Sequence, residues 1–141
     1  MPPTTDYSPD APPQISFSYY KGATFRFAHA FTDRIDNGKE RAQLAKPDGQ
    51  TFAMQIRYDP LDSTVLATID SSFFVLGSSA EDEIYDELSI EAPGHLFTDI
   101  TPGEWYADIF THYEINGTPY SDALLRIRLM FIENVTKQDS P

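Results

Sequence analysis

Short runs in which apolar and polar residues alternate recur along this sequence of 141 residues, and they restrict its fold more than any other feature. Successive side chains of a β-strand point to opposite faces, so a period of two is typical of strands with one buried face. The alternating runs cover residues 15–19, 24–31, 52–58, 65–69, 87–91, 105–111 and 125–131. A short continuous apolar run at 73–76 predicts one further strand.

Turn residues separate these runs and support the same interpretation. Asp59-Pro60, Ala92-Pro93-Gly94 and Thr101-Pro102-Gly103 each end or precede a run. The pair Asn116-Gly117 is favoured in tight hairpins, because both residues tolerate a positive φ. It therefore predicts that the last two strands pair with each other.

Helical spacing is weak throughout the sequence, and its best candidates are residues 39–46 and 94–99. Strands without helical crossovers form either two packed antiparallel sheets or a barrel. We favour an all-β fold, an antiparallel β-sandwich of about seven to eight strands of the immunoglobulin-like type. The residues expected to anchor its core are Phe25, Phe27, Ile56, Trp105, Ile109, Ile127 and Leu129.

The two ends of the chain lack the alternating pattern. Residues 1–13 contain five prolines, which cannot donate hydrogen bonds to a ladder, so we expect a flexible N-terminal arm and a candidate tether. Residues 137–141 are expected to form a disordered C-terminal tail. The β-sandwich domain is therefore predicted to span residues 14–136.

The charge of the chain limits its partners. Lys and Arg number 10 against 22 Asp and Glu, and the resulting net charge of -12 repels phosphate backbones and anionic headgroups. We therefore expect neither nucleic acid nor a membrane as a partner. The chain has no Cys, which excludes disulfides and thiolate metal sites. Its N-terminus shows no signal-peptide pattern, and no apolar stretch approaches the ~20 residues of a membrane span.

Three histidines, His29, His95 and His112, are the candidates for a catalytic base. None of them lies in a recognised catalytic motif. His29 falls on the apolar face of its strand and is predicted to be a core or subunit-interface residue, whereas His95 lies in a turn and His112 near a strand end. We therefore assign no catalytic residue.

Oxygen-rich loops are the candidates for metal or acid–base chemistry. The histidines are too far apart in the sequence for a zinc site in one chain. One loop groups Asp33, Asp36, Asn37 and Glu40 around Gly38, as calcium ligands can be grouped, but the EF-hand spacing is absent. A second loop contains Glu81, Asp82, Glu83, Asp86 and Glu87. These carboxylates would form a glycosidase pair only if folding aimed two of them across a cleft, and we expect a solvated loop instead. No metal or cofactor site is assigned.

Tyrosines are numerous enough that several must lie outside the core. They are Tyr19, Tyr20, Tyr58, Tyr106, Tyr113 and Tyr120. Exposed aromatic side chains mark a contact surface for sugars or proteins, or they cover the sheet with their rings and leave the hydroxyl in water. Both alternatives stay open.

Three segments share a pattern with a known family. Residues 20–27 (YKGATFRF) contain a glycine followed by an alternating run. Residues 96–109 (LFTDITPGEWYADI) contain Thr, Gly, Asp and Ile in that order along the segment. Residues 125–136 (LRIRLMFIENVT) form an alternating run that ends in Val-Thr. In these segments the chain resembles the small β-sandwich domain at the N-terminus of phage baseplate upper proteins and related tail-fibre adaptors. The Pro-rich arm and the long acidic middle depart from that family's pattern.

The resemblance implies a non-enzymatic bacteriophage virion structural protein, synthesised in the host cytoplasm and then located in the virion. It would act as a tail, baseplate or fibre-attachment component through protein–protein contacts with other virion proteins, as a homo-oligomer without a cofactor. One alternative is a carbohydrate- or small-ligand-binding β module, such as a lipocalin-like barrel. Another is a hydrolase that uses the carboxylates of 81–87. We expect function on surfaces, namely the arm at 1–13, the loop at 33–50 and the acidic loop at 77–87.

Overall fold

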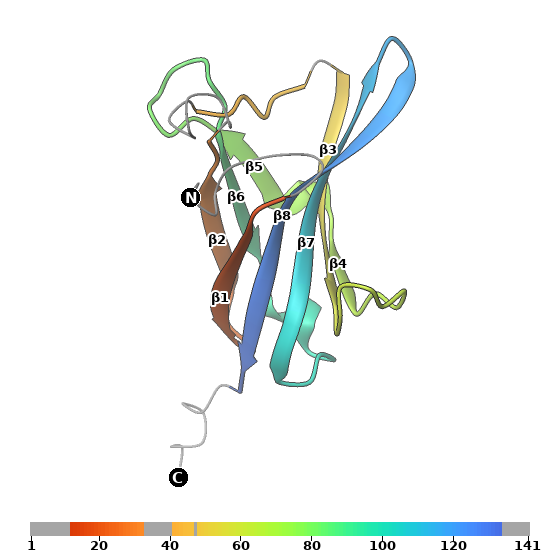
Figure 1. Cartoon of the computed structure of the whole chain (residues 1–141). Coiled ribbons are helices and arrows are strands. Elements are labelled where there is room, and N and C mark those ends of the chain that lie inside the picture. Colours follow the sequence, from red (N-terminus) through yellow and green to blue (C-terminus); the bar gives the residue numbers. More distant parts are fainter. Residues whose placement is uncertain (1–11, 33–40, 47, 134–141) are drawn as a thin grey trace.

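The computed structural model describes residues 12–32, 41–46 and 48–133, and these residues form eight strands in two sheets (Figure 1). Across the first sheet the order is β1 (Gln14–Tyr20), β8 (Thr118–Ile132), β7 (Gly103–Ile115), β3 (Asp48–Arg57) and β4 (Ala67–Ile69). Across the second sheet it is β2 (Phe25–Ala30), β6 (Glu87–Ala92) and β5 (Phe74–Gly77). The predicted all-β class is confirmed.

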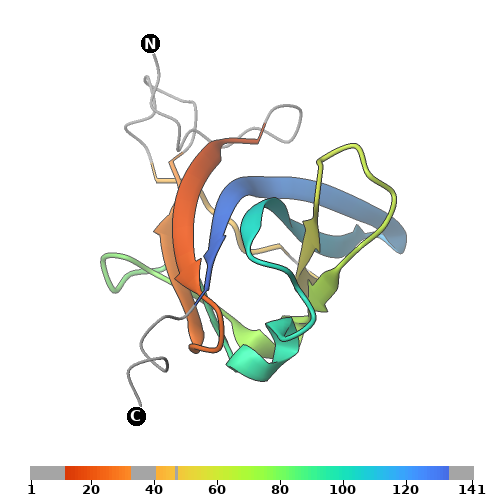
Figure 2. The same cartoon turned by 90° about the horizontal axis from the view of Figure 1, so that it is seen from below.

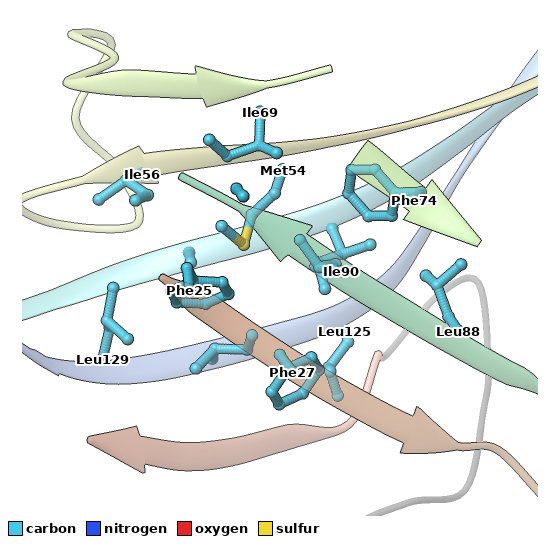
Figure 3. Packing of buried hydrophobic residues seen from close by; sticks show 14 of the residues in the cluster. Phe25, Phe27, Met54, Ile56, Ile69, Phe74, Leu88, Ile90, Leu125 and Leu129 are labelled. Carbon is cyan, nitrogen blue, oxygen red and sulfur yellow. The ribbon is translucent and has the colours of Figure 1, made fainter. Parts of the chain in front are cut away.

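The two sheets enclose one apolar core, to which both contribute side chains (Figure 3). The predicted core residues that are buried are Phe25, Phe27, Ile56, Ile109, Ile127 and Leu129. Trp105 is the exception, because it lies half-buried at the edge of the core. Its indole N–H donates to the carbonyl of Thr101 at 2.7 Å, and its ring meets that of Tyr58 at 4.3 Å between centroids. An indole with a polar N–H fits an edge better than an apolar interior.

The second strand shows why alternation predicts the strands well. Phe25 and Phe27 of β2 point inward and are buried, whereas Arg26 and Ala28 point outward and are exposed. Burying one such aromatic side chain contributes roughly 1.5–3 kcal/mol. A slip of one residue would turn the whole apolar face outward, so the pattern fixes the register.

A β-bulge in β8 interrupts the alternation. Ile109 of β7 pairs with Leu125, but Phe110 pairs with Ala123, which leaves Leu124 as an extra residue. Leu124 and Leu125 are consequently both buried. The alternation predicted this strand only from residue 125, because the bulge shifts the register of its first half.

The edge strand β1 differs from the prediction in its direction. It runs parallel to the end of β8, with Gln14 opposite Arg126 and Tyr20 opposite Ile132. The chain leaves β1 through residues 21–24 and enters the other sheet, so no hairpin dictates an antiparallel partner for β1. The other strand pairs of the two sheets are antiparallel, so the antiparallel arrangement expected from the sequence has one parallel edge.

Helix among the described residues is confined to two short 3-10 turns, η2 (Ser71–Phe73) and η3 (Gly94–Phe97). The second coincides with the helix candidate at 94–99, whereas residues 41–46 of the other candidate are not helical. A Cβ on Gly94 would lie 2.4 Å from the carbonyl oxygen of Gly22, so only glycine fits where η3 meets the β1–β2 turn. No helix in this part of the chain is long and apolar enough to cross a membrane.

The two ends of the sandwich carry different elements. The turn η3 and the C-terminal end of β8 lie at one end, which Figure 2 shows face-on. The opposite end carries the loop between β5 and β6, residues 78–86, and the turn of the β7–β8 hairpin (Figure 1). We call residues 78–86 the acidic loop.

Candidate functional site

Arg41 is the centre of a polar network that holds the acidic loop. Its Nε donates to Oδ2 of Asp86 at 3.0 Å, and its Nη1 donates to Oδ2 of Asp82 at 2.7 Å. Its Nη2 donates to the hydroxyl of Ser78 at 2.9 Å and to the carbonyl of Ile84 at 3.1 Å. The planar fork of one guanidinium thus joins four points of the loop.

Asp86 is the buried member of this network, with 1% of its surface exposed. It also accepts hydrogen bonds from the backbone N–H of Ser79 at 2.9 Å and from the Ser79 hydroxyl at 2.7 Å. The hydrogen bond from Arg41 and those from Ser79 outweigh burial and lower the pKa of Asp86 to about 2. The pKa of Asp82 is lowered as well, chiefly by its hydrogen bond from Arg41. Both carboxylates are therefore ionised at neutral pH.

Gln43 and Leu44 bind the backbone of the acidic loop. The N–H of Leu44 donates to the carbonyl of Tyr85 at 2.9 Å. The side chain of Gln43 accepts from the N–H of Tyr85 at 2.7 Å and donates to the carbonyl of Glu83 at 3.0 Å. Glu81, Asp82 and Glu83 are exposed, as expected of a solvated loop, whereas Asp86 at its end is buried.

This geometry does not favour proton transfer by the acidic loop. A glycosidase needs one carboxylic acid whose pKa is raised, placed across a cleft from an ionised carboxylate. Asp82 and Asp86 instead have lowered pKa values and share one arginine. Their arrangement stabilises the loop.

The β7–β8 hairpin ends in the predicted Asn116-Gly117 turn, where the two residues have φ values of 52° and 81°. The ring of Tyr113 stacks on that of Tyr120 in the facing strand, 5.7 Å between centroids. The Tyr113 hydroxyl donates to Oδ2 of Asp122 at 2.9 Å, and Nζ of Lys46 lies 5.3 Å from the Tyr113 ring centroid. Burial, reinforced by the Asp122 carboxylate, raises the pKa of Tyr113. The predicted hairpin is confirmed.

A shallow hollow of about 280 Å³ opens on the hairpin beside Gly49. His112 and Ser121 line the hollow, and a hydrogen bond of 2.8 Å joins Nδ1 of His112 to Oγ of Ser121. Glu114 and Pro119, which pair closer to the turn of the hairpin, also line it. A hydroxyl–imidazole pair is one component of a nucleophilic site, but catalysis also needs donors for an oxyanion and shelter from water. These four side chains are exposed, which suits ligand contact better than catalysis.

Arginines and carboxylates pair on the outer face of the first sheet. Asp108 is 7% exposed, accepts hydrogen bonds from Arg126 at 2.7 and 3.3 Å, and lies 3.9 Å from Arg57. The hydrogen bond to Asp108 raises the pKa of Arg126. Nearby, Arg128 pairs with Glu104. These ion pairs connect β3, β7 and β8, and their arginines offset the negative charge of Asp108 and Glu104.

The outer face of the second sheet is built from smaller side chains. Ala28 of β2 lies opposite Ser89 of β6, which lies opposite Val75 of β5. Val75 is 66% exposed. Arg26 and Glu91 form an exposed ion pair of 3.1 Å beside this row. A hollow of about 400 Å³ opens over these residues.

The three histidines do not come together. His29 packs beside Phe27 and Phe31, and its buried Nε2 has no hydrogen-bond partner among the residues that the structure describes. Burial lowers the pKa of His29, so its imidazole is neutral at neutral pH. His95 is exposed in η3, and His112 lies in the hairpin. The partly buried position of His29 agrees with its prediction as a core residue.

Possible metal ligands do not gather in groups of three within the described ranges. The candidate calcium loop at 33–40, residues 1–11 of the arm and the tail at 137–141 lie outside those ranges. Of the surface predicted at 33–50, residues 41–44 hold the acidic loop, and β3 begins at Asp48.

Arg41 and Asp108 are the structurally important polar residues that the sequence pattern missed. Arg41 falls between the alternating runs, and Asp108 occupies an outward position where alternation predicts a solvated side chain. The charge balance of the sequence indicated that arginines would form ion pairs. With 10 basic residues against 22 acidic ones, each arginine can pair with one of several carboxylates.

The described residues thus offer three candidate contact surfaces: the hairpin with its hollow, the ion-paired face of the first sheet and the small-residue face of the second. The acidic loop, which Arg41 binds, lies at the same end of the sandwich as the turn of the β7–β8 hairpin (Figure 1). No protein-family model matches the chain, and no curated protein matches it either.

Proposed function

We propose that this chain is a non-enzymatic structural protein of a bacteriophage virion, a tail, baseplate or fibre-attachment component that acts through protein–protein contacts. The resemblance of residues 20–27, 96–109 and 125–136 to baseplate upper proteins motivates the proposal. These segments cover the crossing from β1 to β2, the entry into β7 and the end of β8. Residues 134–136 lie outside the described ranges, and the rest of these segments includes parts of β1, β2, β7 and β8.

An immunoglobulin-like topology is part of the proposal. Variable-type immunoglobulin domains place strands B, E and D in one sheet and strands G, F, C and C′ in the other. The orders β2-β6-β5 and β8-β7-β3-β4 follow this pattern, with β1 added at the edge of β8. Such sandwiches serve as rigid scaffolds that present loops and hairpins to partners.

The observation that carries the proposal is a cluster of exposed apolar side chains on one face of the hairpin tip. Ile115 is 42% exposed and Tyr120 is 45% exposed. The register places both on the same face as Tyr113. Aromatic and apolar side chains on a rigid element are typical anchors of protein interfaces, because they bury a large area at a small cost in entropy.

The partners in this proposal are other virion proteins and further copies of the chain. The protein would be made in the host cytoplasm and located in the virion. Its net charge of -12 disfavours adsorption to the packaged genome.

The test is to purify phage particles from the strain that carries the gene and to quantify the chain in them by mass spectrometry. We expect a fixed ratio to the tail proteins and immunogold labelling at the tail. Particles that lack the chain after a salt wash, with the chain left in the lysate, would contradict the proposal.

A second candidate is a carbohydrate- or small-ligand-binding module, supported by the hollow on the hairpin. His112, Glu114 and Ser121 offer hydrogen-bonding groups at that hollow, as saccharide sites require. Titration with a panel of neutral saccharides, followed by NMR chemical shifts, tests it. Saturable shifts that Ser121→Ala weakens and Ser89→Ala leaves unchanged would support binding there. A lack of shifts at the hairpin across the panel would exclude saccharides.

A further inference from the structure

We infer that the outer face of the second sheet is an interface between two copies of this chain related by a two-fold axis. The inference rests on the proposed function, because it names one of the partners which that function requires. The outward residues of this face are Arg26, Ala28, Ala30, Val75, Gly77, Glu87, Ser89 and Glu91.

Small side chains in the middle of this face allow another sheet to approach closely. Ala28, Ser89 and Val75 form one row across the three strands. Stacked sheets lie about 10 Å apart when their side chains interlock. The hollow of about 400 Å³, which Phe73 also lines, leaves room for side chains of the opposite copy. Val75 of β5, at 66% exposed, lies at the rim of the paired faces, because the axis described below stacks β2 on β6 and leaves β5 beyond the edge strand of the other copy.

The charges identify the occupant as a second copy. Arg26 and Glu91 stand side by side, and their side chains are 71% and 67% exposed, so both can turn toward a partner. A two-fold axis that runs along the strands between β2 and β6 places each Arg26 opposite the Glu91 of the other copy. The same axis places each Ala28 opposite the other copy's Ser89. A cation and an anion side by side are what a self-complementary surface needs.

The net charge of the chain favours this face over others. At -12, two copies repel each other over much of their surface. The outer face of the second sheet carries Arg26 against Glu87 and Glu91, so it adds little to that repulsion. Under the proposed axis, Glu87 lies opposite Ala30 of the other copy rather than opposite another carboxylate. The ion pairs of the first sheet include Asp108, which is buried and cannot turn outward.

The size of the face predicts a weak dimer. Under this axis β2 and β6 of each copy face each other, and two strands spaced ~4.8 Å apart and about six residues long give a face of roughly 200 Å². A standard interface buries ~800 Å² per partner. Association is therefore expected to depend on concentration in solution and to be completed where an assembly holds the copies close together.

The test is sedimentation velocity of the full chain across a wide concentration series. We expect reversible dimers of the unaltered protein. Arg26→Glu and Glu91→Arg, each alone, set like charges against each other across the axis and should weaken the dimer about tenfold or more. An equimolar mixture of the two variants should recover dimers, because each mixed dimer regains two opposite-charge pairs.

Arg128→Glu is the matched control, since it makes the same charge change in an exposed ion pair on the other sheet. It should leave dimer formation nearly unchanged. A monomer at all concentrations, equal weakening by Arg26→Glu and Arg128→Glu, or a mixture that stays monomeric would overturn the inference. None of these outcomes bears on whether the chain is found in virions, so the proposed function fails or stands separately. Dimers that persist in all variants would place the interface elsewhere.

Discussion

The acidic loop and the β7–β8 hairpin lie at the same end of the sandwich but are held in opposite ways (Figure 1). Side chains hold the loop: Asp86 is 1% exposed and bound by Arg41. The backbone ladder holds the hairpin, whose Ile115 and Tyr120 remain open to solvent. The charged network of Arg41 and the acidic loop therefore stabilises the fold, and we call this network the brace, whereas the apolar residues of the hairpin tip are open to solvent.

Replacing Asp86 by Asn is expected to have the largest effect on this contrast, because it leaves the Arg41 guanidinium with a neutral partner in a buried position. Breaking a buried ion pair costs roughly 3–5 kcal/mol. The amide can keep part of the contact with Ser79, so we expect a loss of about 3 kcal/mol in the free energy of unfolding, measured with urea. Asp82→Asn makes the same chemical change at an exposed carboxylate and should cost less. Equal losses would contradict the view that the buried carboxylate of Asp86 holds the acidic loop more strongly than the exposed one of Asp82.

Acid should destabilise the protein by protonating Asp86. The pKa of Asp86 is about 2 in the folded protein and near 4 in an unfolded chain. The folded state therefore binds fewer protons, and the contribution of Asp86 is fully present above about pH 4 and lost as the pH falls toward about 2. This contribution of Asp86 to the free energy of unfolding amounts to about 3 kcal/mol. It should be missing in Asp86→Asn, and urea titrations at several pH values check it. An unchanged acid dependence in that variant would show that Asp86 is not held as described.

The hairpin depends on its turn, and Gly117→Ala tests this dependence. The φ of 81° at Gly117 is unfavourable for a residue with a Cβ, so we expect a loss of about 1 kcal/mol. Gly77→Ala serves as control, because a Cβ there meets no atom within 4 Å. Thermal unfolding of both variants measures the difference. A stable Gly117→Ala variant would mean that the turn adopts another conformation.

The exposed tip should contribute least to stability and most to attachment. Ile115→Ser combined with Tyr120→Ser is expected to lower the free energy of unfolding by about 1 kcal/mol or less, because Tyr120 loses its stacking on Tyr113. The same double variant should be reduced in purified phage particles. Leu61→Ser, at a residue 94% exposed between β3 and β4, is the control and should be incorporated normally. Equal incorporation of both variants would move the contact surface away from the hairpin.

Alternation in the sequence located seven of the eight described strands, and a continuous apolar run located β5. Phe25, Phe27 and Ile56 lie where the pattern put them. The direction of β1 could not be predicted, since it depends on the path of the chain between the sheets rather than on local pattern. The bulge at Leu124 was hidden for a related reason, because it depends on how β7 and β8 pair.

The polar brace was less predictable than the scaffold. Carboxylates at 81–87 were visible as a cluster, but the sequence does not say which of them is buried or which cation reaches it. Arg41 comes from a different loop, and only folding brings it to Asp86. The hairpin tip was easier to find, because Asn116-Gly117 is a local signal with a direct stereochemical cause.

Hydrogen–deuterium exchange of the isolated protein tests most directly whether the acidic loop is a brace and the hairpin tip a free surface. The N–H groups of Ser79, Ile84 and Tyr85 donate to side chains of the network, at 2.9, 3.0 and 2.7 Å respectively. We predict slow exchange at these positions, fast exchange at Asn116-Gly117, and loss of the protection at Ser79 in Asp86→Asn. Exchange at the rate of an unfolded peptide throughout residues 78–86 would contradict the account.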